Sequence, residues 1–295
     1  MAQLLLGKEV TASLNEEIRR KVAQLNEQGV TPKLGIVRIG EREDDISYER
    51  GATKRCETLG VAFEKFLLPA DASEEEVLQV IRAVNEDDSI HGVLLFRPLP
   101  RHLNEDRIVN ALAVEKDVDG ITDLSMASVF MGRGAGYAPC TPSACMRILD
   151  HYGIDCTGKK AVVIGRSLVV GKPAAMMLLK KNATVTVCHT KTVDMPAVVR
   201  EADVVIVAAG RAGIVGADYL RPGQVVIDVG INVNAEGKLC GDVDFASVEP
   251  VAGYITPVPG GVGPMTVAML MKNTLTAARM RQEKLNISKD NGEQK

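Results

Sequence analysis

The sequence has no tryptophan, only 3% aromatic residues and a net charge of −3 with no block of basic residues. Nucleic-acid surfaces need positive stripes and stacking rings, so this composition argues against one. Long apolar runs are also lacking, since stretches such as 174–179 and 204–209 are far shorter than the roughly 18 residues that span a bilayer. The first seven residues have no basic start and no long apolar stretch, unlike an export signal. We therefore expect a cytoplasmic protein that handles a small molecule and has no membrane or nucleic-acid partner.

Clustered metal ligands are missing as well. The six cysteines are scattered without a Cys-x-x-Cys pair, and the four histidines are dispersed. A zinc site needs neighbouring thiolates and imidazoles, and a disulfide scaffold is typical of short secreted chains. Reduced, buried thiols and no metal site are predicted.

What is present in the first third is an alternation of helical and extended patterns. Apolar residues three or four apart predict a helix over 10–28, and Ser73-Glu-Glu-Glu76 has the pattern of a capping box. The other segments predicted here are strands at 33–40, 61–68 and 91–96 and helices at 47–59 and 105–113. Strands separated by helices of this length indicate parallel pairing in a layered α/β domain.

A second α/β series follows a region of weak periodicity between residues 117 and 142, where we place the domain junction. Its predicted helices cover 143–152 and 266–279, and its strands, rich in β-branched residues, cover 160–164, 184–188, 204–208 and 225–229. A length of 295 residues fits about two domains. The expected fold class is therefore α/β with two domains.

A loop with two glycines follows the strand at 160–164. It reads Gly165-Arg166-Ser167-Leu-Val-Val-Gly171 and leads into a helical segment. Glycine at a strand end permits a tight turn, and a second glycine lets a phosphate approach the outward-pointing N–H groups of the helix N-terminus. Ser167 replaces the middle glycine of the common G-x-G-x-x-G pattern, so an ordinary strand–helix turn is the alternative.

The end of the next strand bears on the choice between NAD and NADP. NAD-binding enzymes place Asp or Glu there to bind the ribose 2′-hydroxyl. Here the segment reads Cys188-His-Thr-Lys-Thr192, with no acid. Arg166, Thr190 and Lys191 would suit a 2′-phosphate, so NADP is the predicted cofactor, with a solvated basic turn as the alternative.

Two more loops are expected to face the cofactor, because ligands of open α/β sheets bind beyond the carboxyl ends of the strands. Gly210 follows the strand at 204–208, and Gly230 and Ile231 follow the strand at 225–229. The complete set of predicted cofactor-binding residues is Gly165, Arg166, Ser167, Gly171, Thr190, Lys191, Gly210, Gly230 and Ile231.

Several motifs together resemble one family. They are Gly165-Arg-Ser-x-x-Val-Gly-x-Pro173, Asp228-Val-Gly-Ile-Asn232, Gly241-Asp-Val-Asp244, Pro257-Val-Pro-Gly-Gly-Val-Gly-Pro-Met-Thr266, Lys116-Asp-Val-Asp-Gly120 and Pro139-Cys-Thr-Pro142. These motifs are similar to those of methylenetetrahydrofolate dehydrogenase/methenyltetrahydrofolate cyclohydrolase, the bifunctional folate enzyme. The resemblance extends over most of the chain.

This resemblance implies two α/β domains with a cleft between them: a folate domain of residues 1–140 plus 266–295 and a Rossmann-type NADP domain of residues 141–265. The substrate would be a tetrahydrofolate derivative, and the protein would be a homodimer. Tyr48 and Asp119 would be the catalytic and substrate-binding side chains. The further substrate-binding residues, in a rigid turn that lines the folate, would be Pro257, Gly260, Gly261 and Pro264.

The sequence departs from the family at its cyclohydrolase residues. Family members carry Tyr-x-x-x-Lys on a helix, and this spacing places both side chains on one face. Here the tyrosine is Tyr48, and Ala52 occupies the lysine position. The family's Val-Gln-Leu-Pro-Leu-Pro reads Leu95-Phe-Arg-Pro-Leu-Pro100, so Phe96 replaces the glutamine that hydrogen-bonds that lysine.

The predicted function is therefore NADP-dependent oxidation of 5,10-methylenetetrahydrofolate in one-carbon metabolism, with cyclohydrolase activity weak or lost. The alternative is a fully bifunctional enzyme in which Lys54, Arg97 or another group substitutes for the lysine. Against Lys54, its position rotates it roughly 200° around the helix from Ala52. Against Arg97, a guanidinium stays protonated. A shikimate-dehydrogenase-like oxidoreductase and an inactive folate- or nucleotide-binding module are further alternatives.

Overall fold

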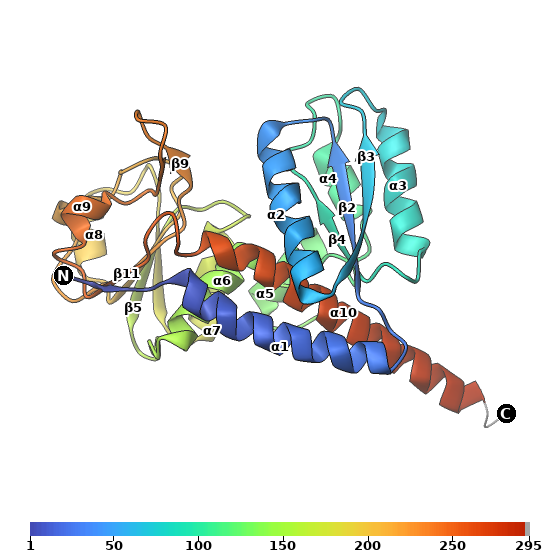
Figure 1. Ribbon diagram of the computed structural model, residues 1–295. Coiled ribbons are helices and arrows are strands. Elements are labelled where there is room, and N and C mark those ends of the chain that lie inside the picture. The colour runs from blue at the N-terminus through green and yellow to red at the C-terminus, as the bar shows by residue number, and fades with distance from the viewer. Residues whose placement is uncertain (293–295) are drawn as a thin grey trace. The chain divides into compact units, whose positions relative to one another are not determined.

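The computed structural model describes residues 1–292, which form two compact units (Figure 1). The first unit contains residues 1–13, 129–133 and 139–269, and the second contains residues 14–128, 134–138 and the chain from residue 270 onward. Two long helices, α1 (Gly7–Glu27) and α10 (Gly263–Gly292), each contribute residues to both units. Neither unit is therefore a single continuous stretch of chain.

The second unit is built on a parallel three-stranded sheet in the order β3-β2-β4. Its strands are β2 (Lys33–Ile39), β3 (Ala62–Leu68) and β4 (Gly92–Leu95), and the helices that begin in it are α2 (Glu43–Leu59), α3 (Glu74–Glu86), α4 (Glu105–Asn110) and α5 (Asp123–Met131). The capping box predicted at Ser73 is confirmed, since its hydroxyl accepts the N–H of Glu76 and the Glu76 carboxylate accepts the N–H of Ser73.

Helices α2 and α3 lie on opposite faces of this sheet (Figure 1), and the alternation of side chains along β2 decides what each face carries. Val37 and Ile39 belong to a buried apolar cluster with the α3 residues Val77 and Ile81. Arg38 points to the other face, where its Nε lies 2.7 Å from a carboxylate oxygen of Glu49 on α2. One face is thus apolar, while the face under α2 contains a buried ion pair.

The first unit is built on a parallel six-stranded sheet in the order β1-β11-β8-β7-β5-β6. Its strands are β1 (Gln3–Leu4), β5 (Lys160–Ile164), β6 (Thr184–Cys188), β7 (Val204–Val207), β8 (Val225–Asp228) and β11 (Tyr254–Ile255), with a hairpin of β9 (Asn232–Val233) and β10 (Leu239–Cys240). Its helices are α6 (Cys140–His151), α7 (Gly171–Lys180), α8 (Met195–Arg200), α9 (Phe245–Val248) and the 3-10 turn η1 (Ala217–Tyr219).

The two-domain α/β class predicted from the sequence is confirmed, with differences at the ends of elements. Helix α2 begins at Glu43 rather than 47, because three acidic residues in its first turn favour the positive end of the helix dipole. Helix α5 was not predicted, since its apolar residues are not gathered on one face. Strands β1 and β11 have only two residues each, too few to show alternation.

The compact units divide the chain close to the predicted domains except at the N-terminus and at residues 129–133, which both belong to the first unit. Residues 1–13 belong to the first unit, because Gln3 and Leu4 pair with β11 and the N–H of Gly7 donates to the carbonyl of Gly260. The predicted folate domain, 1–140 plus 266–295, and NADP domain, 141–265, stay predictions as functional domains. Residues 293–295 of the former lie outside the described residues.

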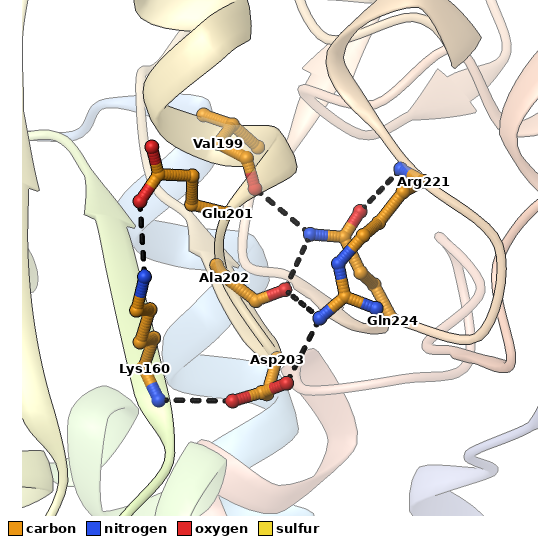
Figure 2. Close-up of polar contacts among 7 residues, drawn as sticks. All are labelled: Lys160, Val199, Glu201, Ala202, Asp203, Arg221 and Gln224. Atoms are coloured by element: carbon orange, nitrogen blue, oxygen red, sulfur yellow. Dashed lines mark hydrogen bonds and ion pairs between the residues drawn. The ribbon is translucent and has the colours of Figure 1, made fainter.

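The amino end of the six-stranded sheet is fixed by the side chain of Gln224, which is fully buried just before β8 (Figure 2). Its Nε2 donates to the carbonyls of Val199 and Ala202 at 2.8 and 2.7 Å, and its Oε1 accepts the backbone N–H of Arg221 at 2.7 Å. The Arg221 guanidinium donates to Ala202 and to a carboxylate oxygen of Asp203, both at 2.9 Å. This cluster connects the end of α8 to the starts of β7 and β8.

His91, just before β4, makes the stability of the second unit depend on pH. Burial, reinforced by nearby cations, lowers its pKa to about 4, and its Nδ1 accepts the N–H of Lys33 at 3.2 Å. Below its ordinary pKa of about 6.5 the unfolded chain binds this proton and the folded chain does not, so stability is lost as the pH falls from 6.5 towards 4. At pH 5 the loss should be about 2 kcal/mol.

Urea unfolding of the parent protein and His91→Gln at pH 7.5 and pH 5 checks this expectation. The variant should lose about 2 kcal/mol less stability between the two pH values than the parent. His151→Gln, at an exposed histidine, is the control and should behave like the parent. An identical pH dependence in parent and His91→Gln would contradict the assignment.

Candidate active site

The strand order of the first unit places four loops along one edge of its sheet. Strands β8, β7, β5 and β6 are parallel neighbours, so the loops that follow them share the carboxyl edge. From β5 the chain continues to β6 on one side of β5 and then crosses to β7 on the other side. The strand order reverses at this point, and open α/β sheets bind ligands at such a switch point. The structure thus brings to one sheet edge the predicted residues after β5, β6, β7 and β8.

The loop between β5 and α7 is packed against its neighbours so closely that its two glycines are required. Gly165 has φ +125°, and a Cβ there would lie 2.1 Å from the carbonyl oxygen of Ala208. A Cβ on Gly171 would lie 2.2 Å from the carbonyl oxygen of Gly165. Ser167 closes the turn, since its Oγ accepts the N–H of Val170 at 3.2 Å. A loop of this kind leaves backbone N–H groups open to a phosphate, which fits a dinucleotide.

The loop after β5 and the turn after β6 each carry an exposed cation, Arg166 and Lys191. Arg166, Thr190 and Lys191 are all exposed, and within residues 1–292 neither Arg166 nor Lys191 has an ion-pair partner. The turn after β6 is ordered by its own atoms: the N–H of His189 donates to Thr192 and the N–H of Lys191 donates to His189 Nδ1. Unpaired positive charge at the end of β6 fits a 2′-phosphate rather than a bare ribose hydroxyl.

Gly210, Gly230 and Ile231 stand at the same edge, and two buried aspartates hold their loops. The N–H of Gly210 donates to Asp242 at 2.8 Å, and the N–H of Gly230 donates to Asp228 at 2.9 Å. Ile231 is 69% exposed. Burial raises the pKa of Asp228 to about 6, although three backbone N–H donors act in the opposite direction. The sequence motifs contained both aspartates but gave no sign of what they contact.

The turn predicted at 257–264 lies in the first unit and is closely packed. A Cβ on Gly261 would lie 2.6 Å from the carbonyl oxygen of Pro257, and one on Gly7 would lie 1.8 Å from the carbonyl oxygen of Gly261. Gly260 has φ +111°, a conformation that favours glycine. Pro264 is exposed at the start of α10. The packing agrees with a rigid turn, while its contact with folate stays a prediction.

Tyr48 and Phe96 lie together in the second unit. Their ring centroids are 5.8 Å apart with planes at 84°, an edge-to-face contact. Ala52, one turn after Tyr48 on α2, is fully buried, and Phe96 is 8% exposed. Positions 52 and 96 are thus both occupied by buried apolar side chains, and the ring of Phe96 contacts Tyr48.

The groups considered as substitutes for the lysine are placed differently. Lys54 lies on the exposed face of α2, as helix geometry predicts. The guanidinium of Arg97 lies 3.7 Å from the carboxylate of Glu105. Arg55, on the Tyr48 face by spacing, donates to the side chain of Asn15 at 3.1 Å.

Asp119, in the motif Lys116-Asp-Val-Asp-Gly120, is half-buried. The two charged residues before it, Lys116 and Asp117, hydrogen-bond to other parts of the second unit. The ammonium of Lys116 donates to the carbonyls of Val84 and Asp87 at 2.6 Å each, around the end of α3. The fully buried Asp117 carboxylate accepts the N–H of Thr122 at 2.8 Å. The role of Asp119 towards a substrate stays a prediction from the family resemblance.

A buried ion-pair network lies under α2, and sequence patterns barely indicate it. Glu49 follows Tyr48 directly, and its carboxylate contacts Arg38 on β2 at 2.7 Å and Lys65 on β3 at 2.8 Å. Burial raises the pKa of Glu49, but the hydrogen bonds from Lys65 and Arg38 outweigh it and hold the pKa below its ordinary value. The available signal was an arginine within an otherwise apolar buried strand. This network fixes α2, and with it Tyr48, on the sheet.

Other site classes find no support in the part of the chain that the structure describes. No helix among these residues is long and apolar enough to cross a membrane. No three His, Cys, Asp or Glu side chains among them come together as metal ligands would. None of the six cysteines, all within residues 1–292, forms a disulfide; five of them are buried and Cys240 is half-buried.

The fold and the loops of the first unit define a dinucleotide-binding α/β protein. A model of the tetrahydrofolate dehydrogenase/cyclohydrolase NAD(P)-binding domain matches residues 139–282, and a model of the catalytic domain of the same proteins matches residues 5–119. The chain belongs to the tetrahydrofolate dehydrogenase/cyclohydrolase family.

Relatives that match about 95% of the chain support the same family. The bifunctional protein FolD of Carboxydothermus hydrogenoformans is 52% identical over 95% of this chain and 98% of its own length. The crystal structure of the bifunctional enzyme FolD from Campylobacter jejuni has a TM-score of 0.93 and 42% identity, covering 95% of this chain and all of that one. The Trypanosoma brucei dehydrogenase-cyclohydrolase, solved with NADP and an inhibitor, has a TM-score of 0.89 and 35% identity over 95% and 98% of the two chains.

Proposed function

We propose that this protein oxidises 5,10-methylenetetrahydrofolate to 5,10-methenyltetrahydrofolate with NADP, and that its hydrolysis of the methenyl product is weak or lost. The observation that supports weak or lost hydrolysis is the apolar pair Ala52 and Phe96 next to Tyr48. The family resemblance implies lysine and glutamine at these two positions. Family membership and the glycine loop at 165–171 support the NADP-dependent oxidation.

The two reactions require different things of the protein. Nicotinamide, when bound, supplies the hydride acceptor, and the chain mainly has to position the reactants. The Gly165–Gly171 loop would hold the phosphates at the N-terminus of α7, and Arg166, Thr190 and Lys191 the 2′-phosphate. Tyr48 would offer its ring to the pterin, and Asp119 would accept hydrogen bonds from it. Hydrolysis instead needs a group that takes up and releases protons, which Ala52 and Phe96 cannot do.

A fully bifunctional enzyme is the second candidate, and the comparisons favour it. Relatives about half identical to this chain are named as bifunctional proteins. A specific observation also favours it: Asp45 is a buried carboxyl one turn before Tyr48, on the same side of α2 as Ala52. Burial raises its pKa, against the opposing effect of Arg42, which lies 3.9 Å away. A carboxyl of this kind can act as a general acid or base.

Two assays on one pure sample separate the candidates: reduction of NADP on addition of methylenetetrahydrofolate, and decay of the methenyl chromophore. Hydride transfer without enzyme-dependent decay supports the first candidate. Enzyme-dependent decay that disappears in Asp45→Asn supports the second and identifies its base. A protein active in neither assay would be an inactive binding module.

The cofactor preference should be at least tenfold for NADP over NAD in kcat/KM. Charge-assisted hydrogen bonds to a phosphate contribute about 1.5–3 kcal/mol each, and 1.4 kcal/mol is tenfold. Arg166→Ala should lower the preference about tenfold or more. Lys159→Ala is the matched control, because it removes the same charge from an exposed position at the opposite end of β5 and should leave the preference unchanged. Equal kcat/KM for both cofactors in the parent protein would contradict the proposal.

We further propose that the protein is a homodimer and works in the cytoplasm. The support is the family resemblance for the first and the composition for the second. Light scattering of the purified protein checks the first of these.

A further inference from the structure

Two buried carboxylates meet beyond the carboxyl end of β8. Asp228, the last residue of β8, is 3% exposed, and Asp242 is fully buried. They are joined through the backbone, since the N–H of Asp242 donates to Asp228 Oδ1 and the N–H of Val243 donates to Asp228 Oδ2, both at 3.0 Å. We call these two residues the aspartate clamp.

Asp242 gathers an unusual number of donors. The N–H groups of Ala209, Gly210 and Arg211, three consecutive residues after β7, donate to it at 2.6, 2.8 and 2.8 Å. The Nδ2 of Asn232 donates at 2.9 Å. A buried carboxylate is stable only when such donors replace its water, and each of these bonds is charge-assisted and therefore strong. The aspartate clamp thus fixes the backbone path of residues 209–211.

The glycines of the neighbouring motifs leave room for this packing. A Cβ on Gly230 would lie 2.4 Å from Asp242 Cγ, and a Cβ on Gly241 would lie 1.8 Å from Asp228 Oδ2. Three segments therefore converge on the aspartate clamp: the loop after β7, the loop after β8 and residues 241–243. The motifs Asp228-Val-Gly-Ile-Asn232 and Gly241-Asp-Val-Asp244 combine the two acids with the two glycines that accommodate them.

One member of the aspartate clamp, Asp228, borders a cavity, whereas Asp242 is fully buried. Ala212, Gly213, Asp228 and Gly241 line part of a cavity of about 420 Å³ within the first unit. This volume is in the range of small-molecule pockets, roughly 300–1,000 Å³. Gly165, in the glycine loop, packs on the carbonyl of Ala208, directly before the first residue held by Asp242. Movement of residues 209–211 would therefore change the glycine loop as well.

We infer that Asp242, supported by Asp228, is a positioning residue for the cofactor: it sets the affinity for NADP by holding residues 209–211 at the sheet edge. This inference rests on the proposed use of NADP. A purely structural role would instead make the aspartate clamp one of several polar clusters that stabilise the unit, with no particular effect on the cofactor. The Gln224 cluster, at the opposite end of β7 and β8, is such a cluster and supplies the control (Figure 2).

The test measures NADP binding by calorimetry without folate, together with thermal unfolding. Asp242→Asn keeps the shape of the side chain but replaces one accepting oxygen by an NH2 group, which cannot accept the backbone N–H groups. This variant should raise the Kd for NADP at least tenfold. The KM for methylenetetrahydrofolate should stay within about twofold. Gln224→Leu should lower the melting temperature at least as much as Asp242→Asn and leave the Kd unchanged.

Asn232→Ala covers the case in which Asp242→Asn does not fold, because it removes one donor and leaves the acid; it should raise the Kd several-fold. An unchanged Kd for NADP in a folded Asp242→Asn variant overturns the inference. If only Asn232→Ala folds, an unchanged Kd in that variant does the same. An equal rise of the Kd in Gln224→Leu also overturns it. Failure of the parent protein to bind NADP would instead refute the proposed function.

Discussion

Methenyltetrahydrofolate is expected to accumulate when the pure protein oxidises methylenetetrahydrofolate. General acid–base groups typically contribute about 10²–10⁴-fold to a rate, so without the lysine–glutamine pair the methenyl product should decay near its rate in buffer. Hydride transfer should proceed at an ordinary enzymic rate, because Tyr48, Asp119 and the glycine loop are present. Absorbance of the methenyl chromophore and of NADPH, followed in the same cuvette, measures both steps.

The double variant Ala52→Lys with Phe96→Gln should restore part of the hydrolysis. Side chains on a helix point towards its N-terminus, so a lysine at 52 would extend over the turn that carries Tyr48. The ring of Phe96 packs against Tyr48, so we expect both changes to be needed. Each single variant serves as a control and should gain less than the pair.

Decay in the parent protein that is clearly above the buffer rate and proportional to enzyme concentration would refute the loss of hydrolysis. Asp45→Asn, Lys54→Ala and Arg97→Ala would then show which group had replaced the lysine. Among these groups the structure favours Asp45, because Lys54 is on the exposed face and Arg97 is close to Glu105.

Gly171→Ala should lower kcat/KM for NADP by at least about 100-fold, since displacements of about 1 Å in a site can cost that much. The added methyl group would lie 2.2 Å from the carbonyl oxygen of Gly165, so the loop or the start of α7 has to move. Initial rates at varied NADP, with circular dichroism to verify folding, measure the effect.

Gly51→Ala is the matched control for this change. Gly51 lies within α2, and a Cβ there would meet nothing within 4 Å. Alanine should leave NADP kinetics unchanged and stabilise the helix by about 0.5–1 kcal/mol. A Gly171→Ala enzyme with parental kinetics would show that the glycine is not needed for the cofactor.

Most of the fold could be predicted because its signals are local. The β-branched strands β5 to β8, the apolar spacing of α1 and the capping box of α3 each depend on residues close together in the chain. Strand β1 could not be predicted in this way, since a two-residue strand exists only through its pairing with β11. Helix α5 carries apolar residues all round and so shows no periodicity.

The residues of the candidate site also differ in whether local sequence patterns predict them. The glycine loop and the turn after β6 follow from strand ends and could be predicted from the sequence. The contacts of Asp242 with Ala209, of Glu49 with Arg38 and of Gln224 with Val199 could not, because they join residues 33, 11 and 25 positions apart in the chain. A buried carboxylate and an exposed one look alike in a sequence, and only the fold shows which donors surround it.

The pairing of β1 with β11 also affects how the protein is made. Gln3 faces Tyr254 in the sheet, so β1 gains its partner only after about 250 further residues have been made, roughly 10–50 s at 5–20 residues per second. Until then, the six-stranded sheet lacks β11 and its edge strand β1 stays unpaired, whereas β2, β3 and β4 are complete within the first third of synthesis. The order of synthesis thus favours the three-stranded sheet of the second unit forming first and the six-stranded sheet of the first unit closing last.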